Sequence, residues 1–348
     1  MPNRFVLLFL SLITGASYGQ ITAAESEPEE SEELPKGRKW VDTSFVSTYP
    51  SKLTGRVYMS QKYSRLHLIT TKPRLPYLPN TSLNLGVGVT YRSVSLNLAY
   101  GFPFLNPHNG KGDTRYLDLQ SHLYGRNWVT DVYGQFYKGY YLKEKGMASA
   151  DKDAYYQRPD LYLRMVGTSV YHLFNGHRFS YRAAFVQNEW QKRSSGSWLA
   201  GAELYAGTFG GDSTVVPGAY SPENPVRKVQ FYKFGPGGGY AYSWVLNRHF
   251  FATFSLTGNL NLTFSREFSD NGRDTRFHVR PNLNYRAVIG YNSPLWNVSL
   301  SMVNSDVALS GDSRNEYLIR TGNYRLTFAR RFPPGRHLRR LAARKPLS

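Results

Sequence analysis

Apolar and polar residues alternate along this chain with a period of two from about residue 82 to residue 332. In the segment 253–264, most even-numbered positions are phenylalanine or leucine, whereas the odd-numbered positions are serine, threonine and asparagine. The segments 82–91, 282–291 and 296–302 follow the same rule. A period of two is that of a β-strand, whose successive side chains point to opposite faces. No helical repeat of comparable length occurs, so the pattern predicts an all-β protein.

The composition of the two faces favours one kind of β-protein. The polar face is rich in serine, threonine, asparagine, glycine and tyrosine, and the apolar face often begins or ends with an aromatic residue. A strand that crosses a membrane needs about ten residues with apolar side chains toward lipid and polar ones toward the lumen. The sequence therefore predicts an antiparallel up-and-down transmembrane β-barrel over residues 42–332. A soluble exported β-rich binding protein remains the alternative fold.

The connections between the segments alternate between short and long, as they do in such barrels. Tight turns are expected at 92–93, 125–127, 175–177, 247–248 and 293–294. Long polar loops are expected at 103–113, 139–159, 208–228, 266–276 and 305–314. The alternation fails only between residues 179 and 229.

Two arrangements restore it. In the first, 55–70 is the first strand and 178–207 is one long bent strand, which gives twelve strands. In the second, 191–196 is a loop and an extra strand lies near 213–219, which gives fourteen. We prefer twelve, because Pro217 makes the extra segment a poor interior strand.

The two ends of the chain differ from the body. Residues 1–19 have the plan of a secretory signal peptide, with Arg4 before an apolar run and small residues at 17 and 19. The acidic segment 20–41 is expected to be a disordered leader, and 333–348 is a basic tail. Export places the barrel in the outer membrane and argues against a nucleic-acid partner.

Charge and composition narrow the possible chemistry. The chain has 43 Lys+Arg and 24 Asp+Glu, a formal net charge of +19, and no cysteine. Without cysteine there are no disulfides, thiolate metal sites or cysteine nucleophiles. The excess of positive charge suits lipid phosphates at the membrane surface, or a lumen that favours anions. Basic residues near the predicted loops and strand ends are Lys111, Arg115, Lys143, Lys145, Lys192, Arg193, Arg227 and Lys228.

The polar phase of the predicted strands gives a candidate lumen set. It mixes acids, bases and hydrogen-bonding groups, which would form a network within a barrel of this size. The set comprises Asp118, Gln120, His122, Asp131, Tyr133, Gln135, Tyr137, Arg164, His172, Arg182, Glu203 and Arg286. Such a network either closes the lumen or surrounds a narrow solute path or ligand pocket.

Catalytic motifs are scarce. His122 and Asp131 fall on adjacent predicted strands and are placed to pair, but no serine lies in a G-x-S-x-G motif. No H-E-x-x-H motif or carboxylate cluster indicates a metal, and no cofactor is expected. The glycines of 235–239 lie within a strand with no helix after it, so they do not form a phosphate loop and instead permit a close approach of neighbours. No catalytic residue is assigned.

Several motifs together resemble an uncharacterised family of Gram-negative outer-membrane barrels, a domain of unknown function. The motifs are Tyr77-Leu-Pro-Asn80, the glycine-rich strand 85–91, Lys138-Gly-Tyr-Tyr141, the segments 156–161, 178–185 and 187–197, and Gly237-Gly-Gly-Tyr-Ala-Tyr242. The resemblance covers residues 42–332. It implies an outer-membrane barrel and brings no activity, ligand or catalytic residue with it.

These observations support an outer-membrane barrel of unassigned role, as a narrow anion-preferring channel or a binder of an envelope ligand. A barrel-embedded hydrolase of lipid or lipopolysaccharide and a soluble exported binding protein are the alternatives, and a non-enzymatic role is favoured. The expected partners are outer-membrane lipid or lipopolysaccharide and the machinery that assembles outer-membrane barrels. The protein is expected to be a monomer.

Overall fold

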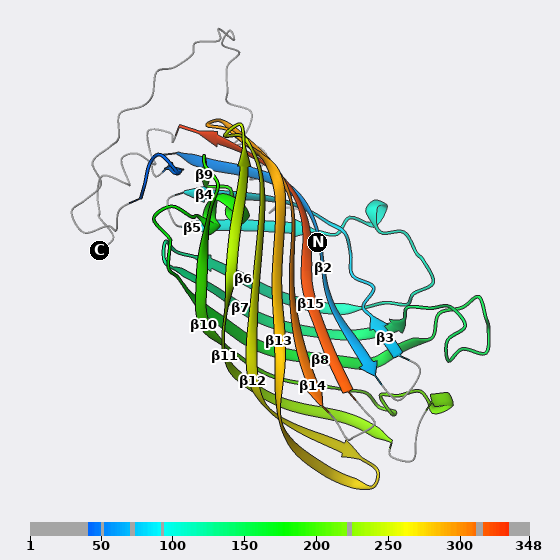
Figure 1. Cartoon of the computed structure of the whole chain (residues 1–348). Helices are drawn as coiled ribbons and strands as arrows, with labels where there is room; N and C mark the ends of the chain where they lie inside the picture. The colour runs from blue at the N-terminus through cyan, green and yellow to red at the C-terminus, as the bar shows by residue number, and fades with distance from the viewer. Residues whose placement is uncertain are drawn as a thin grey trace. The chain divides into compact units, whose positions relative to one another are not determined.

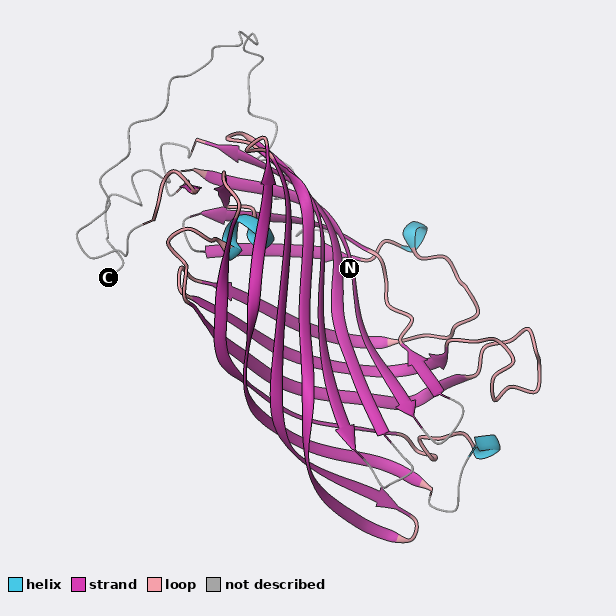
Figure 2. Cartoon of the chain, in the orientation of Figure 1, coloured by secondary structure: helices cyan, strands magenta, loops and turns pink. Residues whose placement is uncertain are grey.

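A computed structural model describes residues 41–49, 52–69, 74–91, 94–220, 225–310 and 316–333. The expected signal peptide, nearly all of the acidic leader and almost the whole basic tail lie outside these residues. None of the helices among the described residues is long and apolar enough to span a membrane. The folded part is built from antiparallel strands (Figures 1 and 2).

Twelve strands follow one another up and down. They are β2 (Leu53–Ile69), β4 (Asn84–Tyr91), β5 (Val94–Tyr100), β6 (Arg115–Tyr124), β7 (Trp128–Leu142), β8 (Gln157–Leu173), β10 (Ser195–Gly210), β11 (Val226–Leu246), β12 (Phe250–Ser269), β13 (Gly272–Asn292), β14 (Trp296–Ser310) and β15 (Glu316–Phe332). The short elements are β1 (Val46–Thr48), β3 (Arg74–Leu78), β9 (Glu189–Gln191) and the helical turns η1 (Pro103–Leu105), η2 (Arg182–Val186) and η3 (Gly218–Tyr220). The prediction of an antiparallel all-β barrel is confirmed.

The barrel closes in an unexpected way. β15 pairs with β2, and the short β3 pairs with both β2 and β7, so a ring of ten strands is complete. Beside β3, β4 and β5 extend the sheet from β2, and β6 extends it from β7. β5 and β6 have no pairing with each other. Twelve strands are therefore present in sequence, but the ring of backbone hydrogen bonds that closes contains ten.

The two faces separate as the alternation predicts. In β12, Phe254, Leu256, Leu260 and Leu262 are exposed on the outside, whereas the asparagines, serines and threonines between them are buried inside. Outward apolar residues on the other long strands are similarly exposed. Soluble monomers rarely expose so large an apolar surface to water. The outer wall is therefore suited to contact with the hydrocarbon of a membrane.

Most predicted turns are confirmed. The two central residues of the β11–β12 turn, Asn247 and Arg248, both have positive φ angles of 50° and 65°. This is the type I′ geometry that matches the twist of a hairpin. The tight turn at 92–93 and residues 311–314 fall outside the described residues. Residues 305–310, expected in a loop, belong to β14. The long loop at 266–276 is wrong, because β12 and β13 continue to Ser269 and from Gly272 as one hairpin.

The segment 178–207 is not one bent strand, and the alternative strand near 213–219 does not form either. After β8 the chain turns inward, forms the π-helical η2 and the short β9, and only then begins β10 at Ser195. β9 pairs with β1 as a separate two-stranded sheet. We call residues 175–194 together with 41–49 the plug.

Candidate functional site

The middle of the lumen is organised around one carboxylate. Glu203, on β10, is 1% exposed and accepts three hydrogen bonds from asparagine side chains on the facing strands. The Nδ2 atoms of Asn261, Asn282 and Asn284 lie 2.7, 2.6 and 2.8 Å from its carboxylate oxygens. These asparagines occupy alternate positions of β12 and β13, so all three point inward. The carboxylate is thus held by neutral donors and leaves no free oxygen facing open space.

Glycines on β11 make room for this network. A Cβ on Gly235 would collide with Asn261, and one on Gly237 would collide with Asn259. Lys233, on the same inward face, is 1% exposed and donates to the Ala308 carbonyl at 3.3 Å. The glycine-rich segment therefore permits a close approach of side chains, as its place within a strand predicts.

A second carboxylate, Asp131 on β7, ties three strands together. His122 Nδ1 on β6 lies 2.6 Å from its Oδ1, and Arg286 on β13 bonds to its Oδ2. Arg286 also donates to the Tyr124 hydroxyl at 2.8 Å. Because Asp131 is fully buried and bound by a guanidinium, its charge is matched across the lumen. His122 stacks with Tyr124, and among the described residues the one hydrogen bond recorded for its ring is to Asp131, not to a serine or threonine hydroxyl.

A third carboxylate, Asp118 on β6, joins β6 to β2 and β7. The Lys62 ammonium on β2 lies 3.3 Å from its Oδ1, and the Tyr137 hydroxyl lies 2.5 Å from its Oδ2. Gln120 and Gln135 complete the shell at 3.3 and 3.4 Å. The carboxylates of Glu203, Asp131 and Asp118 are therefore each held by protein groups.

Between these networks and the end of the barrel with the long loops, the interior is an apolar core. The inward side chains of β8, β10, β11, β14 and β15 here are leucine, methionine, phenylalanine, valine and isoleucine. Val215 and Val216, in the loop between β10 and β11, pack into this core, and the Tyr77 hydroxyl donates to the Val215 carbonyl at 3.2 Å. The long-loop end is thus closed by hydrophobic contact.

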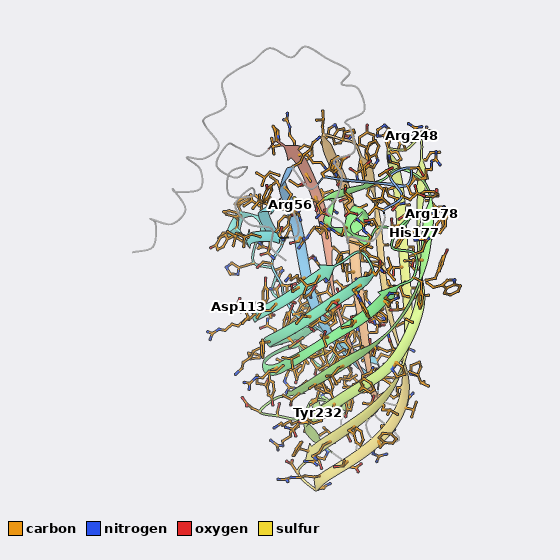
Figure 3. The ribbon with its side chains drawn as sticks, turned by 90° about the vertical axis from the view of Figure 1, so that its left-hand side faces the viewer. Arg56, Asp113, His177, Arg178, Tyr232 and Arg248 are labelled. Carbon is orange, nitrogen blue, oxygen red and sulfur yellow. The ribbon has the colours of Figure 1, made fainter. Side chains whose placement is uncertain are left out.

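At the short-turn end, the plug fills the lumen. Arg331 on β15 donates to the carbonyl of Gln187 at 2.9 Å and to Asn292 Oδ1 at 3.0 Å. The Tyr181 hydroxyl bonds to Ser255 on the inward face of β12. His177, Arg178 and Arg248 lie at this same end (Figure 3).

Ionic contacts hold the two pieces of the plug. Asp42 Oδ2 lies 3.1 Å from Arg178 Nε, and hydrogen bonds from Ser44 hold the pKa of Asp42 below its usual value, with Arg178 adding to the effect. Burial lowers the pKa of Lys192, as do the nearby cations Arg248 and Arg193. Through these contacts, and through the polar networks and the apolar core, the described residues occupy the lumen along its length.

The predicted lumen set is mostly inside. Asp118, Gln120, His122, Asp131, Tyr133, Gln135, Tyr137, Glu203 and Arg286 face inward from the barrel strands. Arg182 lies in the plug, 3.6 Å from Glu189, and not on a strand. The prediction that Arg164 and His172 face the lumen is wrong. On β8 the odd-numbered residues face inward, so these two point outward. His172 contacts the exposed Trp128 on the outer wall.

Sequence reasoning missed the partners of Glu203 and the plug. Asn261, Asn282 and Asn284 carry a usable signal, since amides at alternate positions of two adjacent strands converge on one height of the lumen. No pattern distinguishes the plug, because its apolar residues also alternate.

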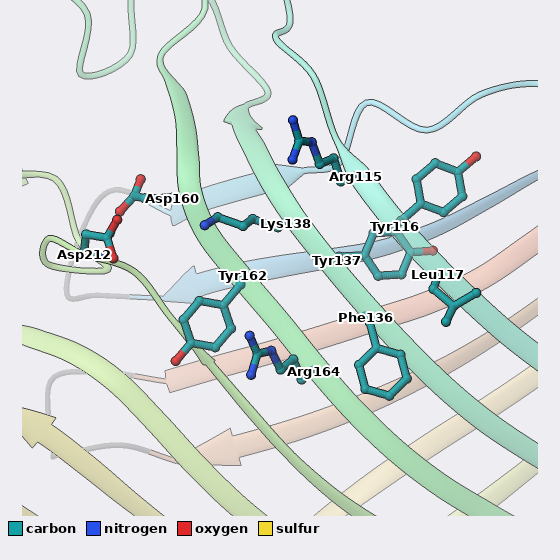
Figure 4. A pocket seen from close by; sticks show the side chains of 10 residues that line it. All are labelled: Arg115, Tyr116, Leu117, Phe136, Tyr137, Lys138, Asp160, Tyr162, Arg164 and Asp212. Carbon is teal, nitrogen blue, oxygen red and sulfur yellow. The ribbon is translucent and has the colours of Figure 1, made fainter.

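An open groove of about 570 Å³ lies on the outer wall near the long-loop end (Figure 4). Its cations come from three neighbouring strands: Arg115 on β6, Lys138 on β7 and Arg164 on β8. Its apolar and aromatic lining is Leu117, Phe136, Tyr116, Tyr137 and Tyr162, and its acids are Asp160 and Asp212.

The charges of this groove are unbalanced. Arg115 and Lys138 are direct cross-strand partners, and like charges in that position repel. Asp160 is already bound by Arg158 through two hydrogen bonds of 2.8 and 2.9 Å. None of the ion pairs that the structure records among its described residues includes Arg115, Lys138 or Arg164. The arrangement can bind an anion that bears apolar groups.

Metal chemistry has no visible site in the described part of the chain. No group of three His, Asp or Glu side chains is placed there to hold a metal ion. The His122–Asp131 pair is committed to the cross-lumen contact with Arg286.

Comparisons with solved structures give outer-membrane proteins at low similarity. The outer membrane protease OmpT from Escherichia coli has a TM-score of 0.36 and 9% identity, with 82% of this chain and 98% of that chain covered. The toluene transporter TodX from P. putida has a TM-score of 0.26 and 7% identity over 82% and 92% of the two chains. OprG from Pseudomonas aeruginosa has a TM-score of 0.21 and 11% identity over 83% and 99%. Similarities this low carry no information about activity.

No curated protein matches the sequence. One family model does, and it covers residues 40–332, nearly the whole of the folded part. Its description is a domain of unknown function, DUF4421. The motifs at 77–91, 138–161 and 178–242 all lie within this range. The chain belongs to the DUF4421 family.

Proposed function

We propose that this protein is an integral outer-membrane barrel that is closed to solutes along its axis and binds a phosphorylated envelope lipid on its outer wall. The membrane location is supported by the exposed leucine and phenylalanine side chains on the outside of β12 and its neighbours. In such barrels the long loops face the cell exterior. The groove at the long-loop end would then lie where the phosphates of the outer leaflet lie.

The observation that carries the proposal is the unmatched cation cluster of the groove. Arg115 and Lys138 face each other across a strand pair with no acid between them, and Arg164 adds a third charge on β8. A phosphate group accepts hydrogen bonds from several such donors at once. Leu117 and Phe136 extend from the cations along the outer wall, where an acyl chain would pack.

An anion-preferring channel is less well supported by the same geometry. Glu203, Asp131 and Asp118 are all held by protein groups, and the apolar core and plug close the two ends. A solute path would require the plug and the 211–220 loop to move together. A hydrolase lacks support because His122 has no nucleophilic partner.

The test compares lipid binding by two charge-matched variants of the full chain in detergent. Each Lys or Arg near an anionic surface contributes about 1 kcal/mol, so the three cations account for roughly 3 kcal/mol, or about 100-fold in affinity. The triple variant R115Q/K138Q/R164Q is expected to bind diphosphoryl lipid A about 10- to 100-fold more weakly by native mass spectrometry. The control R266Q/R273Q/R330Q removes the same charge from exposed positions outside the groove.

The lipid series separates the sources of phosphate. Dephosphorylated lipid A and phosphatidylglycerol serve as comparison ligands. Equal weakening in both triple variants would mean that net charge alone attracts the lipid, and unchanged binding in the groove variant would refute the proposal.

A further inference from the structure

The barrel wall has an unpaired seam between β5 and β6. Among the described strands, β5 pairs only with β4 and β6 pairs only with β7, so each has one backbone edge without a partner from this part of the chain. Residues 96–100 of β5 are exposed on both faces, unlike the inward residues of the other long strands. β3 closes the wall beyond the seam, toward the long loops, where it bridges β2 and β7.

The outer lips of the seam are apolar. Leu96, Leu98 and Tyr100 project outward from β5, and Leu117 and Leu119 project outward from β6. A bare backbone edge is costly in hydrocarbon, and membrane barrels tolerate it where the edge borders protein or a polar interior. The seam therefore sets apolar lips against a polar inside.

Two arginines lie behind the seam without a counter-ion. Arg56 on β2 is 7% exposed and lies over Gly88 of β4, where the side chain of Asn97 from β5 also lies. It donates to the Thr90 hydroxyl, but its Nε has no partner. Arg325 on β15 lies with its guanidinium 4.5 Å from the centre of the Tyr58 ring, and its Nε is also unpartnered.

Other buried arginines have their guanidinium nitrogens better satisfied. Arg286 bonds to Asp131 and Arg158 to Asp160, and Arg331, which has no carboxylate partner, donates to backbone carbonyls and to Asn292. Among the described residues no carboxylate forms an ion pair with Arg56 or Arg325. A buried guanidinium without a partner is unfavourable unless an anion is supplied from outside.

The glycines of β4 fit this arrangement. Gly86 lies under the Tyr58 ring and Gly88 under the Arg56 side chain, and a Cβ at either position would collide with the residue above it. Both side chains therefore lie across β4, and the guanidinium of Arg56 reaches Thr90 of β4, the strand that pairs with β5.

We propose that Arg56 and Arg325 bind the anionic head group of a monoacyl lipid, a single acyl chain that ends in a carboxylate or a phosphate. The ligand enters sideways between β5 and β6. Its head group bonds to the two guanidinium groups, and its acyl chain remains between the leucines of the lips. This site shares Leu117 with the groove on β6–β8, but its cations are different, and it does not depend on the outer-leaflet ligand proposed there.

The test uses the absence of cysteine in the chain. A single cysteine at Ala99→Cys, on the inward face of β5, carries a bimane label, and the full chain is reconstituted in phosphatidylcholine vesicles. Brominated acyl chains that enter the seam quench the label. The probes are dibromostearate, dibromostearoyl lysophosphatidate and a neutral dibromostearoyl glycerol.

The two anions are expected to quench saturably, and the neutral glycerol is expected not to. In R56Q/R325Q the half-saturating concentration should rise at least about tenfold, because two charge-assisted contacts are lost. R273Q/R330Q, with the same charge change at exposed sites, should behave as the parent. Quenching by only one of the two anions would identify the head group as carboxylate or phosphate.

A second variant keeps both arginines. Asn97→Asp places a carboxylate beside Arg56, so it should compete with the ligand and weaken quenching in the same way. The melting temperature of R56Q/R325Q should be no lower than that of the parent, since an unmatched charge is removed. Unchanged half-saturation in both variants, equal quenching by the neutral probe, or no quenching by any probe would overturn the proposal.

Discussion

Replacing Glu203 tests whether the lumen network holds the barrel together. In Glu203→Gln one carboxylate oxygen becomes an NH2 group that faces an asparagine donor. Asn261 and Asn282 each have an unpartnered Oδ1, so one of them can turn its amide and accept from the new NH2 group. If the NH2 group instead replaces Oε2, the bond from Asn284 is lost, because Asn284 Oδ1 already accepts from Ser305. In either orientation the donors lose a charged acceptor. A hydrogen bond to a charged group contributes about 1.5–3 kcal/mol, so we expect the free energy of unfolding to fall by about 2 kcal/mol.

Glu203→Leu is expected to cost more, because all three asparagine amides then lack an acceptor. The size of the effect also depends on Lys233, a buried residue diagonal to Glu203 on the adjacent strand. The recorded hydrogen bond of Lys233 is to a backbone carbonyl and not to a carboxylate. Removing the carboxylate leaves that ammonium unmatched. The double variant Glu203→Leu/Lys233→Met should therefore lose less stability than the sum of the two single changes.

Urea unfolding in detergent micelles, followed by tryptophan fluorescence and by the heat-dependent shift of the folded band in gels, measures these differences. The control variant is Leu283→Met, a change at an exposed position of the outer wall. A free energy of unfolding of Glu203→Gln within about 0.5 kcal/mol of that of the parent would refute the reasoning. A change that small is typical of surface substitutions, whereas the Glu203 carboxylate is buried and accepts three hydrogen bonds.

Three further outcomes follow from the same geometry. Gly237→Ala should lower the free energy of unfolding by about 1–3 kcal/mol, since the new Cβ collides with an inward asparagine, and urea unfolding measures it. The full chain should be silent in planar bilayers, whereas Arg331→Leu, which removes donors to the plug, should show current steps; equal silence in both would contradict the role of that arginine. Asp42 has a lowered pKa, so its contact is fully present above about pH 4 and is lost only as the pH falls below it. A bimane on Ser47→Cys, opposite Trp190, should stay quenched from pH 8 to pH 5 and brighten only in stronger acid.

The sequence predicts the long strands well because each one meets two different solvents. The leucines and phenylalanines of β12 must face one side and its asparagines the other, so the period of two is unambiguous. The Asn247–Arg248 turn is also predictable, since asparagine tolerates the positive φ that a type I′ turn requires.

The rule that polar residues face the lumen fails near the long loops, where the outer face of the barrel meets water instead of lipid. Near the long loops the interior is an apolar core and the outside is wet, so Leu163 and Met165 face inward while Arg164 faces outward. For a related reason, the sequence pattern does not predict the plug. Phe179 and Tyr181 alternate as strand residues do, but they are buried against other parts of the lumen lining. Alternation alone cannot distinguish an outer wall from an inner filling.

Charge matching separates structural polar groups from binding groups in this barrel. The three lumen carboxylates at Asp118, Asp131 and Glu203 are each saturated by donors from facing strands, which is what a fixed filling requires. The cations of the outer groove, and Arg56 behind the seam, are not matched in this way. A filling of fixed groups needs no excess of one sign, whereas a site that receives an anion from outside does. The cations of the outer groove and Arg56 behind the seam are therefore the observations on which the two anionic ligands that we propose at the wall rest.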